Sequence, residues 1–207
     1  MPDAPRSTSN AKPDRASYAN GERRRQQIVE AAIEVFAENG YSGTSLRSIA
    51  ERAGTSHVSL MHHFGSKEAL FQRVLERRLA LDQDVRLAAF AESGIEAAAS
   101  VMMKRNTRSR ALIQLDATIQ VEAVDPNHPA HDYMKQLFAD TVKEVLEQLH
   151  AEESRGVIRE GLPLPVVARQ LGALIIGLQI EWLYDEDLDM ELHVLEFLRL
   201  LRPAPSA

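Results

Sequence analysis

Residues 45–64 have the sequence SLRSIAERAGTSHVSLMHHF, and this stretch decides the fold. Ser45 precedes a short segment, LRSIAERA, whose apolar residues recur at helical spacing. Gly54 suits the end of that helix, and Ser56 is a good N-cap for the next one, which we expect to end at His62 or His63. A helix, a tight glycine turn and a second helix form the outline of a helix-turn-helix, whose second helix enters the major groove of DNA.

Helical patterns flank this stretch on both sides. The arginine run at 23–25 opens a segment in which apolar residues recur every three or four positions until Asn39-Gly40, which predicts a helix that ends there. Downstream, Ser66 suits the N-cap of a helix over 67–85, KEALFQRVLERRLALDQDV. Its expected buried stripe consists of Leu70, Phe71, Val74, Leu75 and Leu81.

The remainder of the chain is predicted to be helical as well, and because no segment alternates as a strand would, the fold class is all-α. The last two helices are apolar on more than one side, so they need cover on both sides. Either they form a central core or they are a self-association face, and Gly172 and Gly177 would let another helix approach closely in either case. The expected helices cover 95–105, 109–124, 131–154, 164–184 and 190–201.

Composition limits the function further. The chain has 207 residues, a net charge of -6 at pH 7 and no cysteine, which excludes disulfides, thiolate zinc sites and cysteine nucleophiles. The acidity is uneven, because residues 1–72 carry nine Lys or Arg and eight Asp or Glu. Residues 1–20 are polar, which predicts a disordered tail. Because we find neither a secretory signal nor the roughly 18 uncharged apolar residues of a membrane span, we expect a cytoplasmic protein.

Residues 21–75 carry a family resemblance. The segment GERRRQQIVEAAIEVFAENGYSGTSLRSIAERAGTSHVSLMHHFGSKEALFQRVL closely resembles the DNA-binding head of the TetR family of bacterial transcriptional regulators. About a quarter of the chain carries the resemblance, and the remainder is similar only in helical layout and length. The matching features include the Ile-x-x-Ala-Ala opening, Phe36, Asn39-Gly40-Tyr41, Thr44-Ser45, Ile49-Ala50, Ala53-Gly54, His63-Phe64 and Lys67-Glu68-Ala69-Leu70.

The resemblance implies a helical homodimer that binds double-stranded DNA at an inverted-repeat operator. It implies a DNA-binding domain over 21–68, with its helix-turn-helix at 45–64, and an effector-binding and dimerisation domain over 69–203. The two copies would pair through the last two helices, and a small-molecule effector would bind in the C-terminal body. We expect no cofactor and no metal.

A set of residues in the head is expected to contact DNA, where phosphate contacts dominate affinity and base contacts dominate specificity. Exposed side chains at the start of the second helix of the motif are the expected base readers. Lys67 corresponds to a family phosphate contact, assisted by its helix dipole. The arginine run either contacts DNA, through phosphate or the minor groove, or forms a solvated helix start. The full set is Arg23, Arg24, Arg25, Ser45, Arg47, Ser56, His57, Val58, Ser59, Met61, His62 and Lys67.

Two positions depart from the family pattern. Met61 stands where the family usually has a tyrosine that donates to phosphate, and methionine cannot donate that hydrogen bond. Val58 stands where glycine or a small residue is common, and its branched apolar surface suits a thymine methyl group. Both changes predict an operator preference unlike that of better-known members. His63 matches a residue that packs the turn after the helix, so we expect a structural role for it.

The effector pocket is expected among the helices between 95 and 184. Apolar side chains, several of them methionines, would form its wall, with a few polar anchors. Ordinary core packing is the alternative for each apolar candidate. The candidates are Met102, Met103, Leu115, Ile119, Glu122, His131, Met134, Phe138, Gln179 and Trp182, with Leu137 and Glu181 as further ones.

The histidines of the helix-turn-helix do not suggest a metal site. Zinc ligands on one helix need a spacing of three or four, which no pair among His57, His62 and His63 has. The segment 123–132 mixes aspartate and histidine, so it is an alternative metal or polar effector contact, although a solvated loop is the simpler interpretation. Because no GxSxG, glycine-rich phosphate loop or HExxH is present, we expect no enzyme.

The sequence therefore predicts a one-component transcriptional regulator, most simply a repressor that an effector releases from its operator. The helix over 67–85 would link the two events, because it begins beside the DNA and runs into the body. The alternative is a helical ligand-binding protein or enzyme with a vestigial DNA-binding head, which Met61 and the nearly neutral head favour. Salt-dependent binding to duplex DNA separates the two.

Overall fold

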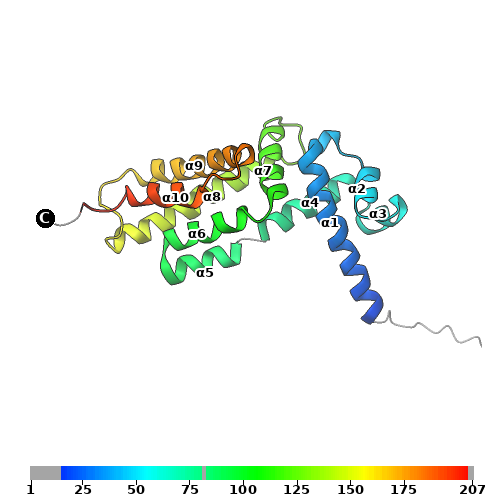
Figure 1. Ribbon diagram of the computed structural model, residues 1–207, viewed down its shortest axis with the longest axis horizontal. Coiled ribbons are helices and arrows are strands. Elements are labelled where there is room, and N and C mark those ends of the chain that lie inside the picture. The colour runs from blue at the N-terminus through cyan, green and yellow to red at the C-terminus, as the bar shows by residue number, and fades with distance from the viewer. Residues whose placement is uncertain (1–14, 81–82, 205–207) are drawn as a thin grey trace, which may run out of the picture.

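The computed structural model describes residues 15–80 and 83–204, and within them it contains ten helices and no strand, which confirms the all-α prediction. Figure 1 shows an elongated molecule, with the N-terminal helices at one end and the C-terminal helices at the other. The helices are α1 (Arg15–Gly43), α2 (Leu46–Arg52), α3 (His57–Phe64), α4 (Lys67–Ala80), α5 (Gln83–Ser93), α6 (Ile95–Asn106), α7 (Arg110–Glu122), α8 (His131–Ser154), α9 (Leu164–Tyr184) and α10 (Met190–Arg199).

The head consists of α1, α2 and α3, and α4 packs against them (Figure 1). Each of the four helices contributes a large side chain to one apolar core, because its apolar residues recur on a single face. This core fixes the angle between α2 and α3 and leaves the opposite face of α3 exposed. The central side chains are Phe36, Ile49, Leu60 and Phe71.

The first helix begins earlier than the sequence pattern suggested. α1 starts at Arg15, so the prediction of a disordered tail over 1–20 is wrong for residues 15–20, while residues 1–14 lie outside the described chain. The polar composition before the arginine run hid a segment without proline or β-branched residues, which a helix can extend through. The expected break at Asn39-Gly40 is confirmed, because Gly40 has φ 69° and ψ 178°.

One helix was expected over 67–85. α4 covers Lys67–Ala80 and α5 begins at Gln83, while residues 81–82, with the expected core residue Leu81, lie outside the described chain. The continuity of the helix through these two residues therefore stays a prediction. α5 packs beside α6, and Gly94 turns the chain between them with φ 83° (Figure 1).

The body contains α5 to α10 and has its own apolar core, which holds Trp182 and the buried faces of α9 and α10. Its last five helices lie within a few residues of their predicted bounds. Among the described residues, α9 is the one helix long and apolar enough to cross a membrane, a test that core helices also pass. α9 packs against α7, α8 and α10, so one of its sides is covered within the chain.

The two cores do not divide at residue 68, where we placed the domain boundary. Leu75 of α4 belongs to the core of the head, and so do Ile119 of α7 and Met134 of α8. The boundary at 68 stays a prediction. The packing shows that α4 and α7 belong structurally to both parts, so movement of either helix in the body would reach the head.

Candidate DNA-binding surface and body cavity

The geometry of α2 and α3 depends on two serine caps. Ser45 Oγ accepts from the backbone N–H of Ser48 (3.1 Å), and Ser48 Oγ accepts from the N–H of Ser45 (3.3 Å), which together form a capping box. Ser56 Oγ accepts from the N–H of Ser59 (3.1 Å) at the start of α3. Gly54 has φ 60°, which lets the chain turn within the few residues between the helices.

The outer face of α3 presents four of the predicted DNA contacts. His57, Val58, Met61 and His62 are exposed, and Val58 keeps 77% of its surface in solvent. Leu60, on the opposite face, is completely buried and holds the helix against the head. The branched apolar side chain of Val58 is therefore available to a partner on this face.

The remaining predicted contacts of the helix-turn-helix differ in exposure and in the hydrogen bonds that they already make. Arg47 is exposed, and we find no ion pair for it among the described residues. Ser56 is exposed and Ser59 is half-buried. The hydroxyl groups of Ser45 and Ser56 already accept the capping hydrogen bonds, so any DNA contact would share them.

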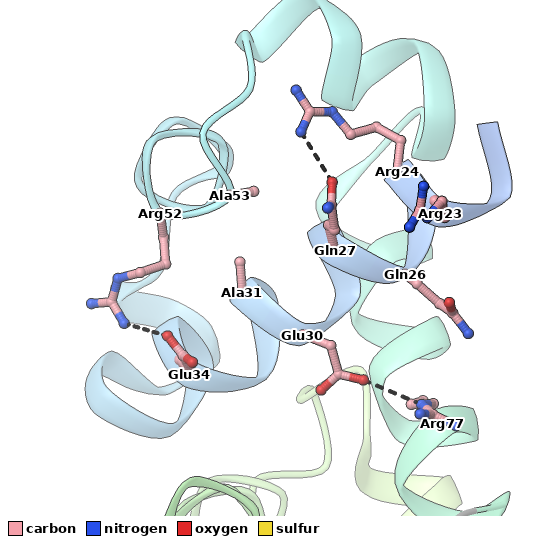
Figure 2. Close-up of a pocket in the computed structure, with 10 residues that line it drawn as sticks. All are labelled: Arg23, Arg24, Gln26, Gln27, Glu30, Ala31, Glu34, Arg52, Ala53 and Arg77. Carbon is pink, nitrogen blue, oxygen red and sulfur yellow. Dashed lines mark hydrogen bonds and ion pairs between the residues drawn. The ribbon is translucent and has the colours of Figure 1, made fainter. Parts of the chain in front are cut away.

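The arginine run lies on α1 beside the α2–α3 turn, and its three arginines differ in their partners within the head. Arg24 donates to Gln27 Oε1 (3.1 Å; Figure 2). It also donates to the carbonyl of Gly54 (3.1 Å), so it fastens α1 to the turn of the motif. Arg25 lies 3.9 Å from Glu22, and Arg23 is exposed. Arg23 and Arg25 therefore have the greater freedom to meet phosphate.

A shallow hollow between α1, α2 and α4 gathers several charged side chains, but these neutralise one another. Arg52 donates to Glu34 (2.9 Å) and Glu38 (2.8 Å), and Arg77 lies 3.4 Å from Glu30 (Figure 2). Guanidinium groups held by carboxylates within the head are poor candidates for DNA phosphate. We therefore assign Arg52 and Arg77 to the packing of the head.

Lys67 is held at the start of α4 by an aromatic ring. Its Nζ lies 4.3 Å from the ring centroid of Tyr41, and burial lowers the pKa of this ammonium group. The hydroxyl of Tyr41 donates to Glu68 Oε1 (3.0 Å), and burial together with that carboxylate raises the pKa of Tyr41 to about 12. Lys67 is half-buried, so a phosphate could reach it from one side only.

His63 has a different environment from its two neighbouring histidines. It is half-buried next to Phe64, and burial, followed by the charges of Arg25, His62 and Arg24, lowers its pKa. A neutral imidazole packed in this way fits the structural role expected for this residue.

The contact between head and body centres on Glu122, at the end of α7. Its Oε2 accepts from the backbone N–H of Tyr41 (2.7 Å), and it sits so close to Gly40 that an added Cβ would come within 2.1 Å of Oε1. Gln114 of α7 also donates to the carbonyl of Ala37 (3.1 Å). The sequence placed Glu122 in the effector pocket, whereas the structure uses it to join α7 to the end of α1.

A cavity of about 240 Å³ lies in the body, between α4, α5, α6, α7, α8 and α9. Most of its wall is apolar, and it includes four residues from our candidate set and also Leu137. The candidates that line it are Met102, Ile119, Met134 and Gln179. It also takes in Leu75 and Arg78 from α4, which begins beside the DNA-binding face.

The other candidates lie elsewhere. Met103, Leu115 and Trp182 are packed in the two cores, and Phe138 is exposed on α8 with 42% of its surface in solvent. His131, the first residue of α8, does not line the cavity, and its Nδ1 is hydrogen-bonded to the carbonyl of Ala123 (2.8 Å). The lining also contains polar and charged residues that the sequence did not single out: Arg78, Arg86, Asn106, Asp116, Gln120, Tyr133, Thr141 and Gln148.

The aspartate and histidine residues of segment 123–132 do not form a ligand set. Asp125 Oδ1 accepts from the N–H of Asn127 (2.9 Å), and His128 Nδ1 accepts from the N–H of Ala130 (3.2 Å). Within the described parts of the chain, no three acidic or histidine side chains converge in a way that could hold a metal ion. The loop interpretation therefore fits the structure better.

Comparison with known proteins identifies the family. The family described as "Bacterial regulatory proteins, tetR family" matches residues 28–74. The repressor AcnR of Corynebacterium diphtheriae is 30% identical over 155 residues, which cover 74% of this chain and 78% of AcnR. The repressor KstR2 of Rhodococcus jostii is 32% identical over 133 residues, which cover 62% of this chain and 59% of KstR2. A transcriptional-regulator structure from Saccharomonospora viridis, solved with choline, superposes with a TM-score of 0.71 at 22% identity, covering 86% of this chain and 96% of its own. The chain therefore belongs to the TetR family of bacterial regulatory proteins, and it is a DNA-binding transcriptional regulator.

Proposed function

We propose that this regulator is a homodimeric repressor that binds an inverted-repeat operator and leaves it when a small molecule fills the body cavity. The observation that carries this proposal is the exposed face of α3, at the opposite end of α4 from the cavity lining. The names of the relatives AcnR and KstR2, both transcriptional repressors, support the direction of regulation. A vestigial head is not favoured, because α2 and α3 are capped and backed by a continuous core.

On DNA, we assign base contacts to the exposed start of α3 and phosphate contacts to the flanking cations. His57 and Val58 would face base edges, with Val58 against a thymine methyl group. Arg47 and Lys67 would contact phosphate, and Arg23 and Arg25 would extend the contact along the backbone. Met61 is exposed at 37% and supplies an apolar contact in place of the tyrosine hydroxyl that the family usually carries.

The dimer would form through α9 and α10. Both helices bury one face in the body, yet Ile180 and Tyr184 of α9, Leu192 of α10 and Leu200, directly after α10, leave apolar surface in solvent. Gly177 lies on the same side of α9 as Ile180 and Tyr184, and a Cβ added there would meet no atom within 4 Å. Two copies packed in this way would place two heads on one face of DNA, at a spacing of about 34 Å.

The link between cavity and head would run through α4 and α7. Lys67 is at the DNA end of α4, and Arg78 near its other end lines the cavity and pairs with Asp116 of α7 (2.7 Å). On α7, Ile119 lines the cavity and Glu122, one turn later, holds the backbone of Tyr41. A ligand that fits the cavity better in one arrangement of these helices would shift the spacing of the heads.

Selection of bound fragments from genomic DNA tests this function. We expect the full-length protein to enrich fragments that share an inverted repeat. Arg47→Ala combined with His57→Ala should weaken binding to that repeat at least tenfold, because it removes one phosphate contact and one base contact from each head. Arg108→Ala with His150→Ala changes the same residue types in the body and should leave binding intact. Enrichment of no common repeat, or equal binding by both double variants, would refute the proposal.

A further inference from the structure

The wall of the cavity combines apolar side chains with a small number of amides. On α6, Ala98, Ala99, Met102 and Asn106 fall on one face, because they recur at a spacing of three or four. Leu171, Ile175 and Gln179 line the cavity from α9 in the same way. A ligand in this space would therefore meet mainly hydrocarbon and methionine, with amide groups at defined points.

Asn106 is the polar lining residue that points to a ligand, because its buried amide nitrogen lacks a hydrogen-bond partner. It is 5% exposed and lines the cavity, and its Nδ2 has no hydrogen-bond partner among the described residues. A buried amide N–H without an acceptor destabilises a folded protein, so such groups are rare. The N–H groups of Asn106 thus offer a donor to whatever occupies the cavity.

A second buried amide lines the cavity. Gln179, on α9, is 8% exposed and also belongs to the lining. The end of α9 is tied to the start of α7, because Arg110 donates to the carbonyl of Leu183 (2.9 Å). Amide groups therefore reach the cavity from both α6 and α9.

The charged groups of the wall already have partners. Arg78 pairs with Asp116 (2.7 Å), and Arg86 donates to Glu144 through two nitrogens. Both pairs are shielded, with side-chain exposures between 17% and 25%. Because each of these arginines already has a carboxylate partner, the two pairs carry no net charge. A charged ligand would lose its hydration in this apolar space without gaining an unpaired counter-charge, a cost that a neutral ligand avoids.

From this arrangement we infer that the effector is an uncharged, mostly apolar small molecule with a carbonyl-type oxygen that accepts from Asn106 Nδ2. The inference rests on the proposed function, because it assigns the effector to this cavity. The volume of about 240 Å³ lies below the roughly 300–1000 Å³ of sites for drug-sized ligands, so the molecule is small.

A series of compounds with one medium-length alkyl chain and different end groups tests the chemistry. The probes are a methyl ketone, the carboxylate, the primary amine and the alkane of the same length, titrated calorimetrically into the full-length protein without DNA. We expect the ketone to bind most tightly, followed by the alkane, and the two charged compounds to bind more weakly than either. Binding of the carboxylate or the amine at least as tight as that of the ketone, or binding of none of the four, would overturn the inference.

Two variants locate the contact. Asn106→Leu should lower the affinity for the ketone about tenfold, as the loss of one hydrogen bond predicts, and should leave the affinity for the alkane unchanged or higher. Thr141→Val removes a hydroxyl from the same lining and should bind the ketone like the wild type. An unchanged ketone affinity in Asn106→Leu would overturn the inference. Release of operator DNA is measured separately. If the ketone binds in a way that depends on Asn106 but does not change DNA binding, the effector role is refuted, whereas the inferred class of ligand for the cavity is supported.

Discussion

Replacing Glu122 with alanine removes the acceptor that joins the body to the head. The backbone N–H of Tyr41 donates to this carboxylate over 2.7 Å, and the side chain of Glu122 is 29% exposed. A hydrogen bond to a charged group contributes about 1.5–3 kcal/mol to stability, and partial exposure favours the lower half of that range. We therefore expect Glu122→Ala to lower the free energy of unfolding by about 2 kcal/mol, which corresponds to a fall in Tm of about 4–8 °C.

Thermal unfolding, followed by circular dichroism at one fixed protein concentration, measures this loss. Glu122→Gln keeps an acceptor but not the charge, so it should lose about half as much. Glu147→Ala is the matched control, because Glu147 is an exposed glutamate on α8 for which we find no hydrogen bond among the described residues. The reasoning is refuted if Glu122→Ala and Glu147→Ala unfold at the same temperature.

Four further substitutions test other contacts. Gly40→Ala should destabilise the protein by about 1–3 kcal/mol, because φ 69° with ψ 178° is strained for alanine and its Cβ would meet the Glu122 carboxylate. Thermal unfolding measures this loss, and a variant as stable as the wild type would contradict the prediction. Arg47→Ala should reduce the salt dependence of DNA binding by about one phosphate contact per head, whereas Arg52→Ala, which loses two carboxylate partners, should lower Tm. Salt titrations and unfolding separate the two, and the reverse pattern would disprove the assignment. Gly177→Leu should convert the dimer to a folded monomer, because the space around Gly177 is open within one chain; sedimentation that still reports a dimer would rule out the proposed interface.

Local rules were sufficient for most of the helices. The caps at Ser45 and Ser56, the apolar spacing of LRSIAERA and the turn at Gly54 predicted α2 and α3, and both helices have these caps in the structure. Caps and apolar spacing involve residues at most four positions apart, so they can be recognised in the sequence without knowledge of the fold.

The contacts between distant segments could not be predicted. Glu122 and Tyr41 are separated by 81 positions, and nothing in either local sequence shows that α7 ends beside α1. Met102 and Met103 are equally plausible as pocket residues in sequence, yet Met102 lines the cavity while Met103 is 1% exposed in the core. Asn106 follows Met102 by one turn, so the orientation of α6, once known, would have identified it as a lining residue.

The most direct test of the central claim is the affinity of the full-length protein for its selected duplex as the salt concentration rises. We expect the logarithm of the association constant to fall linearly with the logarithm of salt concentration, with a slope of about 0.9 for each phosphate contacted. At every salt concentration the selected duplex should bind more tightly than a duplex of scrambled sequence. Affinity that does not change with salt, or that is equal for the two duplexes, would contradict the assignment of α3 and its flanking cations to operator binding.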